Sequence, residues 1–536
     1  MSPKLEGSEN TSRIAFSSLA LPLAAKAVVQ RINRLIAQGQ GRHALGLLPG
    51  LDAFRLHNAA MVDLTKGTFL IDIGNQLDNA EHVRQGISLI QGTDVGTLPM
   101  PHKAQWYYNV GNGYSTLFRL KRITSGFLRP QDPDYRHAKD VYRKAMESNG
   151  LPSETEARLC TNYGNMLRKV GRHVEEIEAY DRALKCVPGH AMALLNKARG
   201  LCWYSRLTER PTKRTTLIEA RGLLMKSLEA GLEEVPRKLA ETELHKLEKI
   251  VRHAKQGTHR PTKHIAHSDV EQSYISFCLK NRLYLHPCPH ESHQAYLDPL
   301  SVSFPTSKMD EHHVRLEKGL GSLKHEYVVT RFLLFCSQSK VPDLGFVDRG
   351  TFLPMRSQGQ GDVYWQLLNF SFRCAYALLD KIAFFLNGYC DLQIREKQVY
   401  FHKDAFLTKE NDLRRQLKPY DGMQLAALVD LCLDFTEPPG PPLKWLKELR
   451  NKLEHRCVIL GEPCNTVKSD IQQAGHAPCP EVLYELPEEE LYRAALQLLK
   501  TARAAIFYLF AFVRGFEKIS TSQLKDEIPP GRLGPP

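Results

Sequence analysis

Arg450, Asn451 and His455 stand within six residues of one another and could together carry chemistry. A guanidinium offers several hydrogen-bond donors to an anion, and an imidazole exchanges protons near neutral pH. Asparagine and histidine add little helix propensity, so a helix face selected only for solubility would use Glu, Lys and Arg instead. The three residues are therefore a candidate reactive cluster. The alternative is that Arg450 and His455 are solvated residues without a catalytic role.

The residues around this cluster predict a helix over residues 443–460. Pro441 and Pro442 set its start, and the apolar residues that repeat at spacings of three and four are Leu446, Leu449 and Leu453. At about 100° per residue, Arg450 and Glu454 lie on one flank of this stripe, and Asn451 and His455 lie further from the core. Arg450 and His455 are about 140° apart around the helix, so one helix alone does not aim both at one phosphate.

Composition places the chain among ordinary globular proteins. It has 536 residues, 42% hydrophobic and 24% charged, which excludes the disordered and fibrous classes. The length suggests about three compact units, or one extended array plus a domain. The formal net charge of +13 favours a polyanionic partner, with nucleic acid first and a membrane surface second.

The apolar run Ala504–Val513 and the cysteines both indicate a cytoplasmic protein. The run has ten residues, short of the ~20 that a spanning helix needs, so it predicts a buried core helix and no membrane partner. The 12 cysteines show no regular spacing, and most lie in apolar helical stretches, which favours reduced core thiols.

A 34-residue unit at residues 157–190 resembles a tetratricopeptide repeat (TPR). The residues at the repeat's offsets are Gly164, Leu167, Gly171, Tyr180, Ala183 and Pro188. In such a unit Gly164 and Ala183 allow two antiparallel helices to approach, and Tyr180 fills the space between them. Glu176 departs from the pattern, because the family usually has a small alanine there.

The resemblance extends to an irregular solenoid. Residues 107–147 look like a second unit, split by a long insert between its two helices. We expect a flexible N-terminus at residues 1–23, a TPR-like region at 24–255 and a basic linker at 256–268. The concave side of such a stack usually binds a protein or peptide ligand.

Residues 269–520 predict a separate all-α domain, followed by a flexible tail at 521–536. Its expected helices span residues 315–337, 363–386, 421–433, 443–460 and 488–519. The segment Arg450–His455 has the R-N-x-x-x-H arrangement that is similar to the signature of the HEPN family (higher eukaryotes and prokaryotes nucleotide-binding). The chain resembles the bacterial HEPN branch that is fused to TPRs, through the segments CLKNRLYLHP, LKHEYVVTRFLL, YALLDKIAFFLN and LRNKLEHR.

The resemblance implies a helical bundle and a metal-independent endoribonuclease that uses no cofactor. In this mechanism an RNA 2′-hydroxyl attacks the adjacent phosphate and leaves a 2′,3′-cyclic phosphate. His455 would be the general acid or base, Arg450 would hold the phosphate, and Asn451 would orient the histidine or a phosphate oxygen. The family brings two such helices together in a homodimer.

Further polar residues are expected to support this site. Glu454 would hold Arg450, and Arg456 would add positive charge. Asp380 and Lys381, inside an apolar helix, would make a buried contact that supports the motif helix or supply a catalytic acid. For Glu326 and Arg331, a structural pairing is the favoured interpretation.

The sequence leaves alternatives to this interpretation open. The loop HPCPHESH holds four possible metal ligands, His286, Cys288, His290 and His293, but their spacing matches no common zinc site. No phosphate-binding glycine loop of the Walker type is present. The sequence therefore predicts a ribonuclease regulated by a TPR sensor, acting as a toxin or in antiviral (anti-phage) defence. The competing hypothesis is a non-catalytic protein-interaction module.

Overall fold

The computed structural model describes residues 22–125, 129–148, 150–208, 212–253, 266, 268–286, 298–302, 304, 310–341, 343–344, 347, 362–436, 441–460 and 483–517. The chain divides into two compact units, which are considered separately below. Unit 1 holds the described residues up to Trp203 and those from Thr216 to His253. Unit 2 holds the described residues of Tyr204–Thr215 and those from 266 onward. Most of the predicted linker and the two predicted tails lie outside the described residues.

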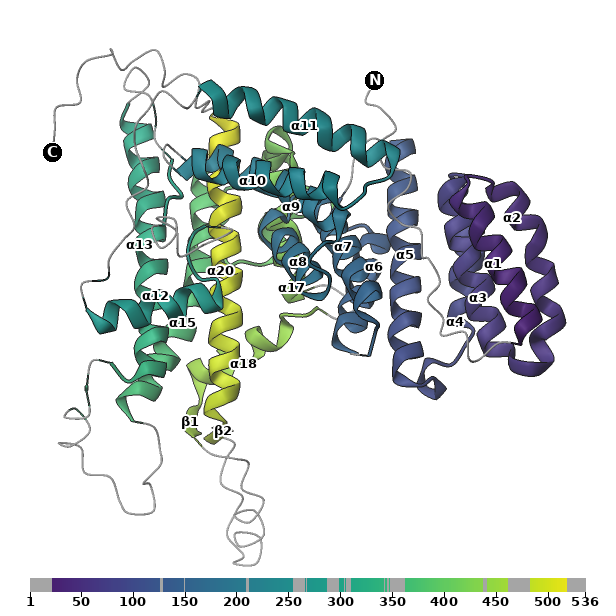
Figure 1. Ribbon diagram of the computed structural model, residues 1–536. Helices are drawn as coiled ribbons and strands as arrows, with labels where there is room; N and C mark the ends of the chain where they lie inside the picture. Colours follow the sequence, from purple (N-terminus) through teal and green to yellow (C-terminus); the bar gives the residue numbers. More distant parts are fainter. Residues whose placement is uncertain are drawn as a thin grey trace, which may run out of the picture. The chain divides into compact units, whose positions relative to one another are not determined.

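Unit 1 is built from helices, as predicted (Figure 1). They are α1 (Leu23–Ala37), α2 (Gly41–Leu47), η1 (Leu48–Phe54), α3 (Arg55–Gln76), α4 (Ala80–Gln91), η2 (Val95–Thr97), α5 (Met100–Ser125), α6 (Pro133–Glu147), α7 (Ser153–Lys169), α8 (His173–Cys186), α9 (Ala191–Tyr204), α10 (Thr212–Glu229) and α11 (Glu234–His253). The last residue of α9 and residues 212–215 of α10 fall in unit 2. The pairs α3 with α4, α5 with α6, and α7 with α8 pack closely, which makes the stack of helical hairpins expected of a solenoid.

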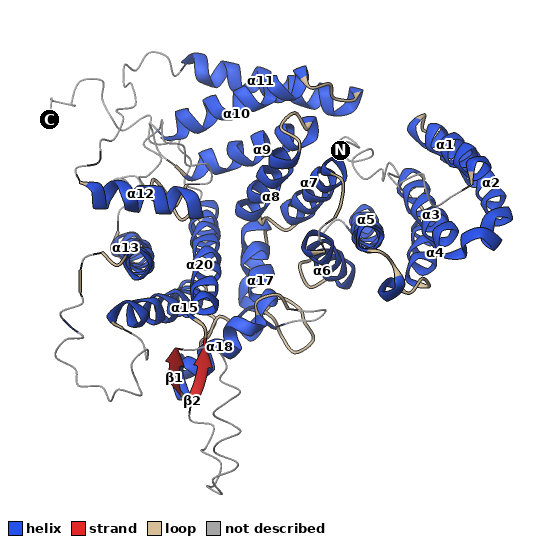
Figure 2. Cartoon of the chain, turned by 60° about the horizontal axis from the view of Figure 1, so that its bottom comes forward, coloured by secondary structure: helices blue, strands red, loops and turns tan. Residues whose placement is uncertain are grey.

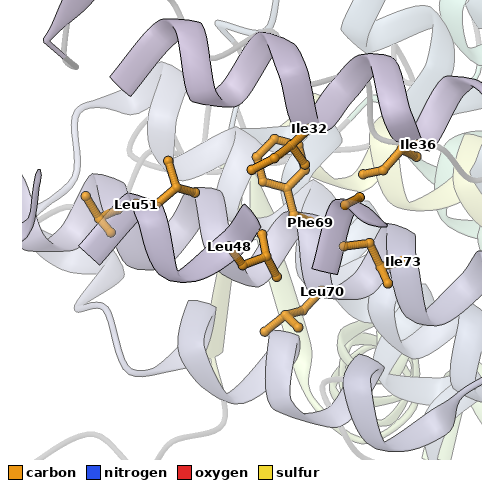
Figure 3. Close-up of a cluster of buried hydrophobic side chains, with 9 residues drawn as sticks. Ile32, Ile36, Leu48, Leu51, Phe69, Leu70 and Ile73 are labelled. Atoms are coloured by element: carbon orange, nitrogen blue, oxygen red, sulfur yellow. The ribbon is translucent and has the colours of Figure 1, made fainter. Parts of the chain in front are cut away.

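The first helices of unit 1 share one apolar cluster (Figure 3). Ile32 and Ile36, four residues apart on α1, meet Phe69 and Ile73, four apart on α3. All four are at most 6% exposed. Apolar residues at this spacing share one helix face, so each helix buries its stripe against the other.

The predicted repeat at residues 157–190 corresponds to the hairpin of α7 and α8. A Cβ atom placed on Gly164 would lie 2.5 Å from Cε1 of Tyr180, so only glycine allows the tyrosine ring to pack at this position. The Tyr180 side chain is fully buried, and its hydroxyl donates a hydrogen bond to Asn165 Oδ1 at 2.9 Å. The close approach that the repeat spacing predicts is therefore present.

The hairpin of α5 and α6 repeats the same contact and corrects the predicted insert. A Cβ atom on Gly111 would lie 2.6 Å from the ring of Tyr142, which is also fully buried. The extra residues between the two repeat positions do not all form a loop, because α5 continues to Ser125. Much of the predicted insert is therefore additional helix.

Unit 2 is a helical bundle, which confirms the all-α prediction, with one short strand pair added (Figure 1). Its elements are α12 (Asp269–Asn281), α13 (Glu311–Ser339), α15 (Val363–Tyr389), η7 (Glu396–Gln398), α16 (Lys403–Phe406), η8 (Arg415–Tyr420), α17 (Met423–Thr436), α18 (Lys444–His455), β1 (Cys457–Leu460), β2 (Leu483–Leu486) and α20 (Glu488–Phe516).

Helix α20 is the core helix of this bundle. It packs against α13, α15 and α17, and every residue of the predicted apolar run Ala504–Val513 is at most 4% exposed. By length and composition, α20 is long and apolar enough to cross a membrane, but 83% of its most apolar stretch is buried inside the protein. Such burial is what a core helix requires.

The predicted helix over residues 443–460 is wrong at its end. α18 ends at His455, Arg456 is extended (φ −128°, ψ 153°), and residues 457–460 form strand β1. β1 pairs in parallel with β2, with Cys457 opposite Leu483 and Leu460 opposite Leu486. Val458 and Ile459 are β-branched and favour a strand over further helical turns. The strand pair thus joins the end of α18 to the start of α20.

Replacing Gly164 with alanine is expected to destabilise unit 1. The new methyl group would overlap the Tyr180 ring, which is fully buried and hydrogen-bonded, so the cost should be about 1–3 kcal/mol. Gly222 in α10 is the matched control, because a Cβ atom there meets nothing within 4 Å. Gly222→Ala should stabilise the protein by roughly 0.5–1 kcal/mol. Urea unfolding followed by circular dichroism checks both, and equal midpoints for the two variants would contradict the packing described.

Candidate functional site

Helix α18 presents the predicted cluster on its outer side. Its buried residues are the predicted stripe, Leu446, Leu449 and Leu453, at 0%, 4% and 6% exposure. Arg450 is half-buried at the edge of this stripe, while Asn451 and His455 are exposed. His455 is the last residue of the helix. The helix therefore holds these three side chains where a ligand can reach them.

Arg450 lies against α15 of the same unit. Its guanidinium carbon is 5.5 Å from the centroid of the Tyr376 ring, and Nη1 donates a hydrogen bond to Asn451 Oδ1 at 3.4 Å. A cation above an aromatic face is attracted by the negative charge of the ring surface. Burial raises the pKa of Tyr376 to about 12, so the phenol stays neutral at physiological pH.

Asp380 lies one helical turn beyond Tyr376 on α15. Burial raises the pKa of its carboxyl group, while the amide of Phe401 and the positive charge of Arg450 act in the opposite direction. The Phe401 amide donates a hydrogen bond to Asp380 Oδ1 at 2.9 Å. Asp380 therefore ties the segment that precedes α16 to α15, one turn from the Tyr376 ring that Arg450 contacts.

Glu454 does not hold Arg450 in the way the helix spacing predicted. Its carboxylate accepts two hydrogen bonds from Arg373 of α15, at 3.0 Å from Nε and 2.8 Å from Nη2. These hydrogen bonds lower the pKa of Glu454, with smaller contributions from the charges of Arg373, Arg450 and His455. The pair with Arg373 thus fastens the last turn of α18 to α15.

The other residues predicted to support the site make contacts outside the Arg450 cluster, except Arg456, which follows His455. Lys381 pairs with Glu326 of α13 at 2.5 Å, so both serve the contact between α13 and α15. Arg331 is buried and pairs with Asp298 rather than with Glu326. Arg456 follows His455 directly and begins the extended segment that leads into β1. Figure 2 shows the two strands beside α18.

Arg373 and Tyr376 were not identified as site residues from the sequence. Together with Asp380 they occur at spacings of three and four along α15, so they share one face of an otherwise apolar helix. That polar stripe is the signal that could have found them. The spacing within α15 does not show which helix this stripe contacts, so it could not predict the contact with α18.

The candidate metal loop is described only at His286. This residue is 5% exposed, and its carbonyl oxygen accepts a hydrogen bond from Arg503 Nη2 at 2.8 Å. Cys288, His290 and His293 lie outside the described residues. Among the residues described, no group of three or more His, Cys, Asp and Glu side chains is placed to hold a metal ion.

Arg373→Gln should lower stability at neutral pH by about 0.2–1 kcal/mol, the range for partly exposed ion pairs. Because the pair lowers the folded-state pKa of Glu454, its contribution is complete above the unfolded value of about 4.3 and disappears as the pH falls through the folded value. Urea unfolding of the parent and the variant from pH 7 downward tests this.

Arg315→Gln is the control for this measurement, since Arg315 forms an exposed pair with Glu311 within α13 alone. We expect the gap between the parent and Arg373→Gln to close in acid. If the difference in unfolding free energy between the parent and Arg373→Gln grew as the pH fell, it would contradict a pair that lowers the pKa of Glu454.

Comparison with known proteins gives one family. Residues 308–515 match the family model described as LA2681-like HEPN, a span that includes α13, α15, α17, α18, α20 and both strands but not α12. No curated protein matches the chain. The part of the chain that carries Arg450, Asn451 and His455 is therefore similar to HEPN domains of the LA2681-like family.

Proposed function

We propose that the protein is a metal-independent endoribonuclease of the HEPN type. The observation that supports this most is the exposed row of Asn451 and His455 beside an arginine that α15 holds in place. Arg450 has its guanidinium over Tyr376 and a hydrogen bond to Asn451. A solvated arginine on a helix surface needs no such support. The match of residues 308–515 to an HEPN family model agrees with this proposal.

In the proposed reaction the RNA 2′-oxygen forms a bond to the neighbouring phosphorus and the bond from phosphorus to the 5′-oxygen breaks. A base removes the proton of the 2′-hydroxyl, and an acid delivers a proton to the departing 5′-oxygen. His455 serves as acid or base, because an imidazole can do either near neutral pH. Arg450 binds the phosphate oxygens as negative charge develops on them, and Asn451 orients Arg450. The products are a 2′,3′-cyclic phosphate and a 5′-hydroxyl.

We further propose that unit 1 regulates this activity by binding a protein or peptide ligand. Its stacked hairpins supply extended surface and no cluster of reactive side chains was predicted in it, which suits recognition better than catalysis. A ribonuclease under such control would serve as a toxin or as an effector of anti-phage defence in the cytoplasm.

Arg450→Ala and His455→Ala should each abolish RNA cleavage while leaving the fold intact. Both side chains lie off the buried stripe of α18, and loss of a general acid or base typically costs 10²–10⁴-fold in rate. The test is expression of the parent and both variants in a bacterial host, followed by RNA profiling and end-group analysis with EDTA present. Arg315→Ala and His325→Ala, both on α13, are the matched controls and should cleave like the parent.

Cleavage that persists in both folded variants, or that EDTA abolishes, would refute the mechanism. An inert parent that captures a defined partner, equally well after His455→Ala, would support the interaction module instead.

The geometry of α18 supports a homodimer. Arg450 and His455 point about 140° apart around one helix, so a phosphate contacted by Arg450 of one copy is better served by His455 of a second copy. Two such helices facing each other would form two equivalent sites related by a twofold axis.

Mixing the two inactive variants tests this arrangement. In a mixed dimer, the Arg450→Ala chain supplies His455 and the His455→Ala chain supplies Arg450, which leaves one of the two shared sites intact. Refolding or co-expression at equal amounts should restore about a quarter of the parent activity, because about half of the dimers are mixed and each has one intact site. No recovery in mixed dimers isolated by two different tags would show that each site uses a single chain.

A further inference from the structure

The segment Tyr400–Lys403 is joined to α15 at Asp380, one helical turn from the Tyr376 ring that Arg450 contacts. It is fixed there by Phe401, whose amide donates to Asp380 Oδ1 at 2.9 Å and whose ring is 5% exposed. That ring packs against Phe406 and Phe435, with centroid distances of 5.9 and 6.3 Å. Because Phe401 is anchored at both backbone and side chain, its two neighbours are held in a defined place.

Those neighbours, Tyr400 and His402, flank the anchor. The amide of His402 donates to the carbonyl oxygen of Tyr400 at 2.7 Å, so the chain turns tightly here. Tyr400 leaves 53% of its surface exposed, although its neighbours Val399 and Phe401 are buried. An exposed aromatic ring on a rigid turn is a surface on which a flat ligand can stack.

Positive charge connects this turn to α18. Burial lowers the pKa of His402, the carboxylate of Asp404 opposes this shift, and the charges of Lys447 and Lys403 add to it. The charges of both lysines therefore act at this turn. Lys447 precedes Arg450 and Asn451 by three and four residues and therefore shares their side of α18.

Two carboxylates on α18 lie beside a cation, and Asp404 lies beside an imidazole. Glu454 is paired with Arg373, and Asp404 lies 3.2 Å from the imidazole of His402. Glu448 lies 3.6 Å from Lys444. The cations thus lead from the Tyr400 turn toward the phosphate-binding position expected at Arg450.

We propose that Tyr400, Lys403 and Lys447 form a binding track for single-stranded RNA that leads to Arg450 and His455. The track rests on the proposed ribonuclease function and specifies the substrate class of that same site. An aromatic platform combined with backbone-tracking cations is the pattern by which proteins bind single strands without reading their sequence. A duplex keeps its bases stacked on each other, so it cannot stack a base on Tyr400.

The test measures binding of the full-length protein to a 2′-O-methyl oligoribonucleotide, which lacks the attacking hydroxyl and so cannot be cleaved. Tyr400→Ala should weaken binding by about 5- to 150-fold, the range for losing one stacked base, whereas Tyr400→Phe should stay within about twofold. Lys447→Ala should weaken binding and reduce the slope of log K against log salt by about 0.7. Duplex RNA of the same length should respond little to Tyr400→Ala.

Phe332→Ala and Lys318→Ala are the matched controls. Phe332 is an exposed aromatic on α13, at 40% exposure, and Lys318 is an exposed lysine on the same helix. Both should bind RNA like the parent. The track is wrong if Tyr400→Ala binds like Phe332→Ala, or if it changes the oligomeric state in sedimentation instead of RNA affinity, which would assign the surface to a second copy of the chain.

Cleavage of unmodified RNA separates this proposal from the ribonuclease proposal. With both correct, Tyr400→Ala raises KM and leaves kcat close to the parent value. If the parent binds the single strand through Tyr400 but cleaves no RNA, the track stands and the ribonuclease function fails. If the parent cleaves and Tyr400→Ala changes neither binding nor KM, the ribonuclease function stands and the track fails.

Discussion

The packing of α15 against α20 is the contact on which unit 2 depends. α20 is buried almost throughout its second half, and α15, which packs against it, buries apolar side chains that include Leu368, Phe372 and Leu379. Burial of such side chains is the main favourable term in folding, and it fixes the rotation of α15 about its own axis. Once that rotation is fixed, the direction in which Arg373, Tyr376 and Asp380 leave the helix is fixed as well. The core therefore decides where the polar stripe meets α18.

α18 adds little apolar surface of its own, so polar contacts set its orientation. Its three buried leucines pack it against the bundle, and polar contacts with α15 add to them. The two-pronged bond between Arg373 and Glu454 acts at one point, and the stacking of Arg450 on Tyr376 acts one turn earlier. Two contacts at different points along the axis of α18 fix its orientation, whereas a single contact would not. Arg450, Asn451 and His455 thus lie on a short helix that contacts with α15 help to orient.

The sequence predicted the features that depend on residues close together in the chain. The glycine and tyrosine of the 157–190 unit, the buried run of α20 and the leucine stripe of α18 follow from residues within one or two turns of each other. The partner of Glu454 did not, because Arg373 lies 81 residues away and i, i+4 geometry offered Arg450 as an equally good cation. The end of α18 was missed for a related reason, since β1 is stabilised by pairing with a strand beyond residues 461–482. The length of α5 was missed because an interrupted repeat looks like an inserted loop.

The late position of α20 in the chain has a consequence for biosynthesis. α13, α15, α17 and α18 all leave the ribosome before it does, and the first three of them wait for α20 to cover part of their apolar surface. Domains fold as units during synthesis, so the bundle stays incomplete while these helices emerge. The strand that follows His455 also waits, because β2 immediately precedes α20. A nascent chain would thus carry Arg450 and His455 before the helices that orient them are complete, so the candidate site is among the last parts of unit 2 to assemble during translation.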